Sequence, residues 1–290
     1  MKMKNLIKTS LVFCLFITIN TNAQKMKTVA GFNHVESVAT DGKFIYAADI
    51  GKELNATTKD GDGQITVIEN GKAHVFVAGL DDPKGLAIID QVLYIADNKR
   101  VLKVDLAGAD KAQVKVFSAA TAFPETPVFL NDLEADIAGN LYVSDSGDLK
   151  GNGGAIYKID PQGQVTLVIN GKQDARILAP NGLLMDDSGD VVLEVDLASG
   201  ILYSYNMKTK VLTNLAEGFG GADGLVHHSN GNMFVSDWKN GKVFSVNVAG
   251  DVKEIKSGYQ SAADIALTKD EKTIMVPDMK AGELDFIQLP

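Results

Sequence analysis

The sequence predicts an all-β protein, a six-bladed β-propeller whose last blade is closed by the N-terminal strand. A short apolar segment that ends in aspartate recurs six times, at 46–49, 94–97, 142–145, 193–196, 234–237 and 275–278. The intervals between these aspartates are 48, 48, 51, 41 and 41 residues, which is the length of one four-stranded blade. Many of the 28 glycines follow Asp, Asn or Ser in pairs typical of hairpin turns.

The N-terminal residues differ from the repeats. Three lysines, Lys2, Lys4 and Lys8, precede an apolar run, and Ala23 ends a small-residue cleavage site. This pattern predicts a signal peptide over 1–23, cleaved after Ala23, and one exported propeller domain over 24–290, located in the periplasm or secreted. The only cysteine, Cys14, lies in this segment and follows Phe13, where a lipoprotein signal would have a small residue. We therefore expect a mature chain without a disulfide or a membrane anchor.

Each repeat supplies the strands of one blade in order. The run 27–31 is β-capable but has no repeat of its own, and the last repeat, 262–290, is one strand short. We therefore expect the N-terminal strand to complete the last blade. Alternating or apolar runs predict further strands at 44–48, 64–69, 74–77, 92–96, 101–104, 113–117, 141–144, 155–159, 165–169, 191–195, 202–205, 211–215, 232–236, 242–246 and 252–255.

Two groups of aspartates receive a structural interpretation. Asp60 and Asp62 are spaced as in part of a calcium loop, but the third aspartate and the distal glutamate are missing, so a hairpin turn is predicted. The six strand-end aspartates occur in every blade. They are therefore predicted to accept hydrogen bonds in turns and caps rather than to perform chemistry.

When the six repeats are aligned, one position near the start of each forms a mostly polar column. This column contains Glu36, Lys84, Asn131, Asn181, Asp223 and Ala263, and the residue two positions later is always Leu, Val or Ile. Innermost strands run beside the propeller axis, so these ring positions should surround one end of the central channel.

The composition of this ring favours a hard cation. Glu36 and Asp223 would repel each other at short range, and the amide oxygens of Asn131 and Asn181 complete an all-oxygen set that suits Ca²⁺, although another divalent cation is possible. None of the four histidines occupies the column, which argues against zinc. The alternative is that the polar side chains only line a water-filled channel.

The motifs that contain these residues resemble those of the SMP-30/gluconolactonase/LRE family. The segments are VESVA with Glu36, FLNDLEADIAGNLYVSD with Asn131, APNGLLMDDSG with Asn181 and ADGLVHHSNGNMFVSD with Asp223. The resemblance covers essentially the whole mature chain. It implies a propeller hydrolase with one divalent cation, usually calcium, held by Glu36, Asn181 and Asp223. It also implies that Asn131 lies beside the metal and contacts substrate or water.

The sequence departs from the family at the substrate side. Phe129 stands where gluconolactonase-type members have a substrate-binding arginine, Leu133 stands where they have a glycine, and Lys84 enters the ring. The resemblance makes Asn131 a candidate substrate-binding residue, and the departures add Lys84 and Phe129. The departures also argue against a sugar-acid lactone as the substrate.

The expected reaction is metal-dependent hydrolysis of a lactone or a related ester. Asp223 or Asp132 would accept the proton of the attacking water. No Gly-x-Ser-x-Gly motif and no mature cysteine offers another nucleophile. The alternative is a non-catalytic, calcium-stabilised periplasmic ligand-binding propeller. A third possibility, a paraoxonase-like esterase with two calcium ions, is weaker because the sequence offers no inward-facing histidine pair to match it.

The charge limits the partners. Without residues 1–23 the chain has 25 basic and 37 acidic residues, a net charge of −12, which disfavours nucleic acid and anionic membranes. The expected partner is a small molecule, and the expected oligomeric state is a monomer because a closed propeller has no free sheet edge.

Overall fold

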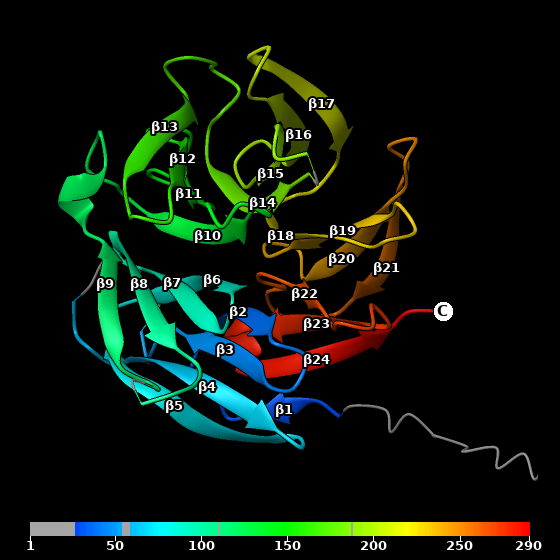
Figure 1. Ribbon diagram of the computed structural model, residues 1–290. Coiled ribbons are helices and arrows are strands. Elements are labelled where there is room, and N and C mark those ends of the chain that lie inside the picture. The colour runs from blue at the N-terminus through cyan, green and yellow to red at the C-terminus, as the bar shows by residue number, and fades with distance from the viewer. Residues whose placement is uncertain (1–26, 54–58, 110, 187) are drawn as a thin grey trace, which may run out of the picture.

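The computed structural model describes residues 27–290 except 54–58, 110 and 187. The predicted signal peptide, residues 1–23, lies outside the described residues. Six antiparallel sheets of four strands surround a common axis, as Figure 1 shows, and the predicted six-bladed propeller is confirmed. In the described part of the chain, no helix has the length and apolar character needed to span a membrane.

The first three blades follow the chain in order. Blade 1 contains β2 (Val35–Thr40), β3 (Ile45–Asp49), β4 (Gly63–Glu69) and β5 (Lys72–Leu80). Blade 2 contains β6 (Pro83–Ile89), β7 (Val92–Asp97), β8 (Arg100–Asp105) and β9 (Val114–Ser118). Blade 3 contains β10 (Leu130–Ala135), β11 (Leu141–Asp145), β12 (Ala155–Ile159) and β13 (Val165–Asn170), after the short 3-10 helix η1 (Ala120–Ala122).

The last three blades complete the ring. Blade 4 contains β14 (Pro180–Met185), β15 (Val191–Asp196), β16 (Ile201–Asn206) and β17 (Val211–Glu217). Blade 5 contains β18 (Ala222–His227), β19 (Met233–Asp237), β20 (Lys242–Val246) and β21 (Val252–Ser257). Blade 6 contains β22 (Ala266–Leu267), β23 (Thr273–Asp278) and β24 (Glu283–Gln288), with the 3-10 helix η2 (Met279–Ala281) between the last two strands.

The N-terminal strand closes the propeller as predicted. β1 (Val29–Ala30) pairs antiparallel with β24, with Val29 opposite Leu284, and the sheet order is β1-β24-β23-β22. The two ends of the described chain are therefore joined in one sheet.

The cores lie between neighbouring blades. In the second strand of each blade, which ends at the strand-end aspartate, successive side chains point to opposite faces of the sheet. Val143 packs in one apolar cluster with Ala96 of the preceding blade, and Ile95 packs in another cluster with Ala48 of the blade before it. The position of Val143 is also apolar in four other blades, but blade 4 has Glu194 there, fully buried.

The strand-end aspartates are acceptors, as predicted. Asp49 accepts backbone N–H groups of Asn33 and His34, and Asp145 accepts those of Val128 and Phe129. Asp97, Asp196, Asp237 and Asp278 accept equivalent bonds. These carboxylates fix the segment that leads into the innermost strand of each blade.

The hairpin of β3 and β4 also forms. In its long loop, Asp62 accepts the N–H of Lys52 at 3.0 Å.

The innermost strands of neighbouring blades approach each other closely. A Cβ on Gly182 would lie 2.3 Å from the carbonyl oxygen of Asp223, and one on Gly85 would lie 2.5 Å from the carbonyl oxygen of Asn131. Glycine is therefore required at these positions, each directly after a ring position. In blade 3 the residue directly after the ring position is Asp132 instead of glycine. Its carboxylate hydrogen-bonds the next blade by accepting the N–H of Leu183 at 2.7 Å.

Candidate active site

A β-bulge places each polar ring residue. In blade 1, Val35 is opposite Asp49 whereas Ser37 is opposite Ala48, so Glu36 is one extra residue in the inner strand. The register of β6, β10, β14 and β18 shifts in the same way around Lys84, Asn131, Asn181 and Asp223. A bulge breaks the in-and-out alternation of side chains and re-aims the extra one. The repeated bulge explains why this column points toward the axis.

Five ring residues from five blades line one cavity. They are Glu36, Lys84, Asn131, Asn181 and Asp223, and all five are buried. The cavity has a volume of about 220 Å³, and its remaining wall is apolar: Ile50, Phe129, Leu149, Leu197, Trp238 and Met279. We call these six residues the apolar collar. Ala263, the sixth ring position, is buried without lining this cavity.

Four oxygens in this cavity lack a protein donor in the described part of the chain. They are Glu36 Oε2, Asn131 Oδ1, Asn181 Oδ1 and Asp223 Oδ1. A buried acceptor without a partner costs about 1–3 kcal/mol. Four of them around one cavity therefore fit a cation, and carboxylate and amide oxygens are ligands that Ca²⁺ accepts. Among the described residues no group of three or more His, Cys, Asp or Glu side chains could hold a metal, so such a site needs the amides.

Hydrogen bonds orient both amides. Asn131 Nδ2 donates to Ser146 Oγ at 3.1 Å, and Ser146 Oγ donates to the carbonyl oxygen of Pro180 at 2.7 Å. The side chain of Asn181 hydrogen-bonds Asp223. In each case the amide N–H is engaged by the protein. The Oδ1 atoms are thereby left as acceptors for a ligand.

Burial and neighbouring acids destabilise the ionised forms of the two ring carboxylates. Burial raises the pKa of Glu36 well above its usual range, and the charges of Asp223 and Asp264 raise it further, whereas Lys84 lowers it. Burial also raises the pKa of Asp223 well above its usual range, with a contribution from Asp264, against the lowering effect of the Asn181 hydrogen bond. A bound cation would reverse this by favouring both ionised forms.

Lys84 is paired within the site. Its Nζ lies 2.5 Å from Asp82 Oδ2 and 4.6 Å from the centre of the Phe129 ring, and neither Lys84 nor Asp82 is exposed. Sequence reasoning missed Asp82. Its position two residues before the ring, where other blades have no acid, was the available signal.

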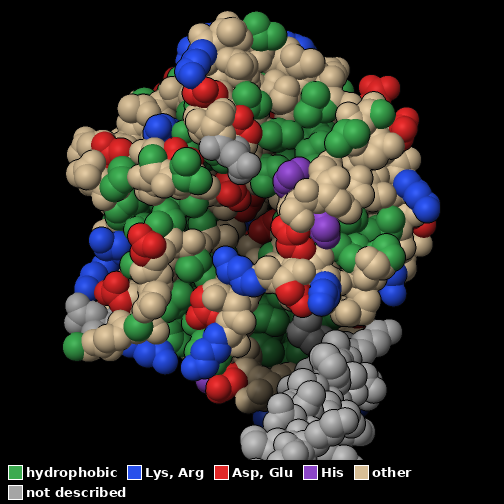
Figure 2. All heavy atoms as spheres, turned by 45° about the vertical axis from the view of Figure 1, so that its right-hand side comes forward, with side chains coloured by type: hydrophobic (Ala, Val, Ile, Leu, Met, Phe, Trp, Pro, Cys, Tyr) green, Lys and Arg blue, Asp and Glu red, His purple; other side chains and the backbone are tan. Residues whose placement is uncertain are grey.

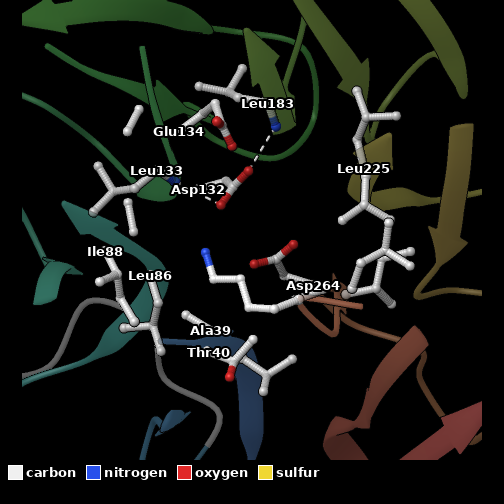
Figure 3. Close-up of a pocket in the computed structure, with 18 residues that line it drawn as sticks. Ala39, Thr40, Leu86, Ile88, Asp132, Leu133, Glu134, Leu183, Leu225 and Asp264 are labelled. Atoms are coloured by element: carbon white, nitrogen blue, oxygen red, sulfur yellow. Dashed lines mark hydrogen bonds between the residues drawn. The ribbon is translucent and has the colours of Figure 1, made fainter. Parts of the chain in front are cut away.

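Asp132 lies elsewhere. Its carboxylate accepts the N–H groups of Leu133 and Leu183, both at 2.7 Å, and it lines a second cavity with Glu134 and Asp264 (Figure 3). Burial, and then the charge of Asp264, raises the pKa of Asp132 well above its usual range. Asp132 therefore does not line the cavity that contains Asp223. Figure 2 shows that one face of the propeller is hollowed at its centre, with acidic side chains in the hollow.

Solved structures share this fold. A protein provisionally assigned as a gluconolactonase aligns over 91% of both chains with a TM-score of 0.69 and 14% identity. Regucalcin of Agrobacterium tumefaciens, described as a calcium-binding protein, aligns over 84% of this chain and 82% of its own, with a TM-score of 0.66 and 17% identity. A nidogen/laminin complex aligns over 77% and 79%, with a TM-score of 0.59 and 19% identity.

The sequence comparisons identify the family. A search of curated protein sequences found no significant match. The family model of the SMP-30/Gluconolactonase/LRE-like region matches residues 36–277, from the first ring residue to the last blade. The chain therefore belongs to the SMP-30/gluconolactonase/LRE-like family.

Proposed function

We propose that the protein is an exported, divalent-cation-dependent hydrolase that opens a lactone or cleaves a related ester in the cavity of the polar ring. One observation carries the proposal: four donor-free oxygens, from Glu36, Asn131, Asn181 and Asp223, converge on one cavity. Family membership supports a lactonase-type activity, and the similarity to a regucalcin described as calcium-binding supports Ca²⁺.

The residues of the chain have separate roles in this reaction. Glu36, Asn131, Asn181 and Asp223 would hold a divalent cation, which would supply Lewis-acid polarisation of the carbonyl and a lowered pKa for water. Asp223 accepts the proton of the attacking water through the lone pair of Oδ1 that the cation would leave free, because Oδ1 faces the cavity while Asn181 engages the carboxylate. Asp132 is assigned a structural role, since two backbone N–H groups engage it and it lines the other cavity.

The bond changes are those of acyl-oxygen cleavage. The water oxygen bonds to the carbonyl carbon, the bond from that carbon to the ring or ester oxygen breaks, and the proton passes from Asp223 to the departing oxygen. The products are a hydroxy acid from a lactone, or an acid and an alcohol from an ester. The apolar collar excludes other water from the reacting atoms.

Chelation tests the proposal. The protein is depleted of metal, assayed on a panel of lactones and aryl esters, and then assayed again with Ca²⁺, Mg²⁺ or Zn²⁺ added. We expect activity to fall about 100-fold or more on chelation, because a metal ion supplies several kcal/mol of transition-state stabilisation, and to return with Ca²⁺. Glu36→Gln and Asp223→Asn should abolish it, whereas Glu217→Gln, an exposed carboxylate change, should have no effect.

Binding measurements separate this from the alternative. Ca²⁺ should raise the Tm of the wild type and not that of Glu36→Gln. A Ca²⁺-dependent ligand stabilisation without any turnover would favour the non-catalytic ligand-binding propeller, for which the Lys84–Asp82 pair beside Phe129 is the supporting observation. Absence of any Ca²⁺ effect on both Tm and activity would refute the metal site. Sequencing the N-terminus of the exported protein tests cleavage after Ala23.

A further inference from the structure

Most of the apolar collar comes from the residue that follows each strand-end aspartate. These residues are Ile50, Asn98, Ser146, Leu197, Trp238 and Met279. The backbone N–H of each donates to the carbonyl oxygen of the residue two positions before the ring position of its blade, at 2.9–3.3 Å. Each is thus fixed as the next tier outside the ring. Four of the six are large and apolar, and those four line the cavity.

The polar groups of this tier are already engaged. Trp238 Nε1 donates to the sulfur of Met279 at 3.1 Å, and Lys280 Nζ lies 3.8 Å from the centre of a Trp238 ring. Ser146 is occupied by Asn131 and Pro180. The tier therefore presents the cavity with hydrocarbon and offers no free hydroxyl or amide to a ligand among the residues that line it.

Leu149 completes the collar at a conformational cost. It lies in the loop between β11 and β12 with φ of 59°, in the left-handed region that disfavours a leucine. Asp148 fixes this loop by accepting the N–H groups of Lys150 and Asn152. Leu149 lines the cavity and remains 38% exposed. A large apolar residue held in a strained conformation at the cavity wall points to a function for its side chain.

The ring residues and the apolar collar together restrict the kind of substrate that fits the cavity. The polar side chains that line the cavity are the five ring residues, and Asp82 already pairs Lys84. With the four donor-free oxygens engaged by the cation, a ligand with several hydroxyls would bury them without partners. A volume of about 220 Å³ exceeds the 150 Å³ of a cavity that binds benzene, so a small ring with an alkyl chain fits.

We propose that the apolar collar selects lactones that carry an alkyl substituent over polyhydroxylated lactones, with the carbonyl at the polar ring and the chain along Leu149, Leu197 and Trp238. This inference rests on the proposed hydrolase function. It assigns to the collar the selection between substrates and to the ring the reaction itself.

The test compares chain length. We measure kcat/KM in Ca²⁺ for γ-butyrolactone and its γ-alkyl homologues, and for glucono-δ-lactone. A transferred methylene corresponds to about a fourfold change, so kcat/KM should rise about fourfold per carbon over the first few carbons. Glucono-δ-lactone should react more slowly than the alkyl lactones. Equal or faster reaction of glucono-δ-lactone would overturn the inference while leaving the hydrolase standing.

Variants connect the effect to the collar. Leu149→Asn places a residue that tolerates a positive φ at the strained position, so the fold and its Ca²⁺-dependent Tm should be retained while the chain-length dependence is reduced. Trp238→Gln should reduce it as well. Ile137→Asn is the matched control, because Ile137 is 89% exposed in the β10–β11 hairpin. An unchanged chain-length dependence in both collar variants would overturn the assignment.

Binding distinguishes the two proposals. If no lactone is hydrolysed, the affinities of γ-alkyl lactams, which resist hydrolysis, are measured by calorimetry in Ca²⁺. A rise in affinity with chain length that Leu149→Asn reduces would support the collar although the hydrolase had failed. Affinity independent of chain length would refute the collar.

Discussion

Replacing the buried Glu194 should stabilise the protein. Glu194 is fully buried in β15, and no protein group in the described part of the chain donates to either carboxylate oxygen. In the sheet it is opposite Leu183 and Tyr203, so it faces the apolar cluster between blades 3 and 4. Glu194→Val introduces the residue that three other blades have at this position.

The magnitude follows from burial and ionisation. A buried polar group without a partner costs about 1–3 kcal/mol. Burial, and then the charge of Asp196, raises the pKa of Glu194 well above its usual range, and each unit of such a rise costs about 1.4 kcal/mol once the unfolded chain has ionised. We therefore expect Glu194→Val to raise the free energy of unfolding by about 2–4 kcal/mol at pH 7.

The pH dependence has a definite sign. Below the usual pKa of a glutamate the carboxyl is protonated in both states, so its pKa shift costs nothing there. As the pH rises toward the raised folded pKa, the unfolded chain loses its proton first, and the wild type loses stability. The advantage of Glu194→Val should therefore grow from pH 4 to pH 7.

Urea unfolding at pH 4 and pH 7, with and without Ca²⁺, measures these differences. Glu194→Gln is the control, because it keeps the size and removes the ionisation. It should lose the pH-dependent part of the difference and retain the cost of an unpaired polar group. A Glu194→Val protein that is less stable than the wild type at both pH values would refute this reasoning.

Three further predictions concern the ring. Ser146→Ala removes the acceptor that orients Asn131 and should weaken Ca²⁺ binding, measured by calorimetry, roughly 10-fold or more. Gly182→Ala places a methyl group 2.3 Å from a backbone carbonyl oxygen of β18 and should lower the free energy of unfolding, measured in urea, by about 2–3 kcal/mol. Lys84→Met leaves Asp82 buried without its cation and should cost about 3–5 kcal/mol, which the double variant with Asp82→Leu should largely recover; failure of that recovery would contradict the pairing.

The internal repeat made the fold and the ring predictable. Because six copies of one unit occur in a single chain, aligning them places Glu36 and Asp223 in one column although they lie far apart in sequence. A ring architecture then brings the column to one axis. The cavity that these two residues share with Lys84, Asn131 and Asn181 is the result.

Aligning the repeats does not show into which cavity each side chain points. Asn131 and Asp132 are consecutive, but the bulge between Leu130 and Leu133 sends them to different cavities. Sequence reasoning alone treated both as candidates for one site. The apolar collar, in contrast, had a readable signal, because Leu197 and Trp238 occupy the same position after a strand-end aspartate.

Lys84 does not neutralise the carboxylates of the ring. Lys84 enters the ring as a cation and lowers the pKa of Glu36, but Asp82 lies 2.5 Å from its ammonium group and balances it. Glu36 and Asp223 in their ionised forms therefore contribute two uncompensated negative charges to a buried cavity, which is costly without a counter-charge. A divalent cation balances both, whereas a monovalent ion balances one. The Asp82–Lys84 pair thus leaves the ring with the charge that a divalent ion neutralises, and selective stabilisation by Ca²⁺ over K⁺ in a thermal unfolding assay is the expected consequence.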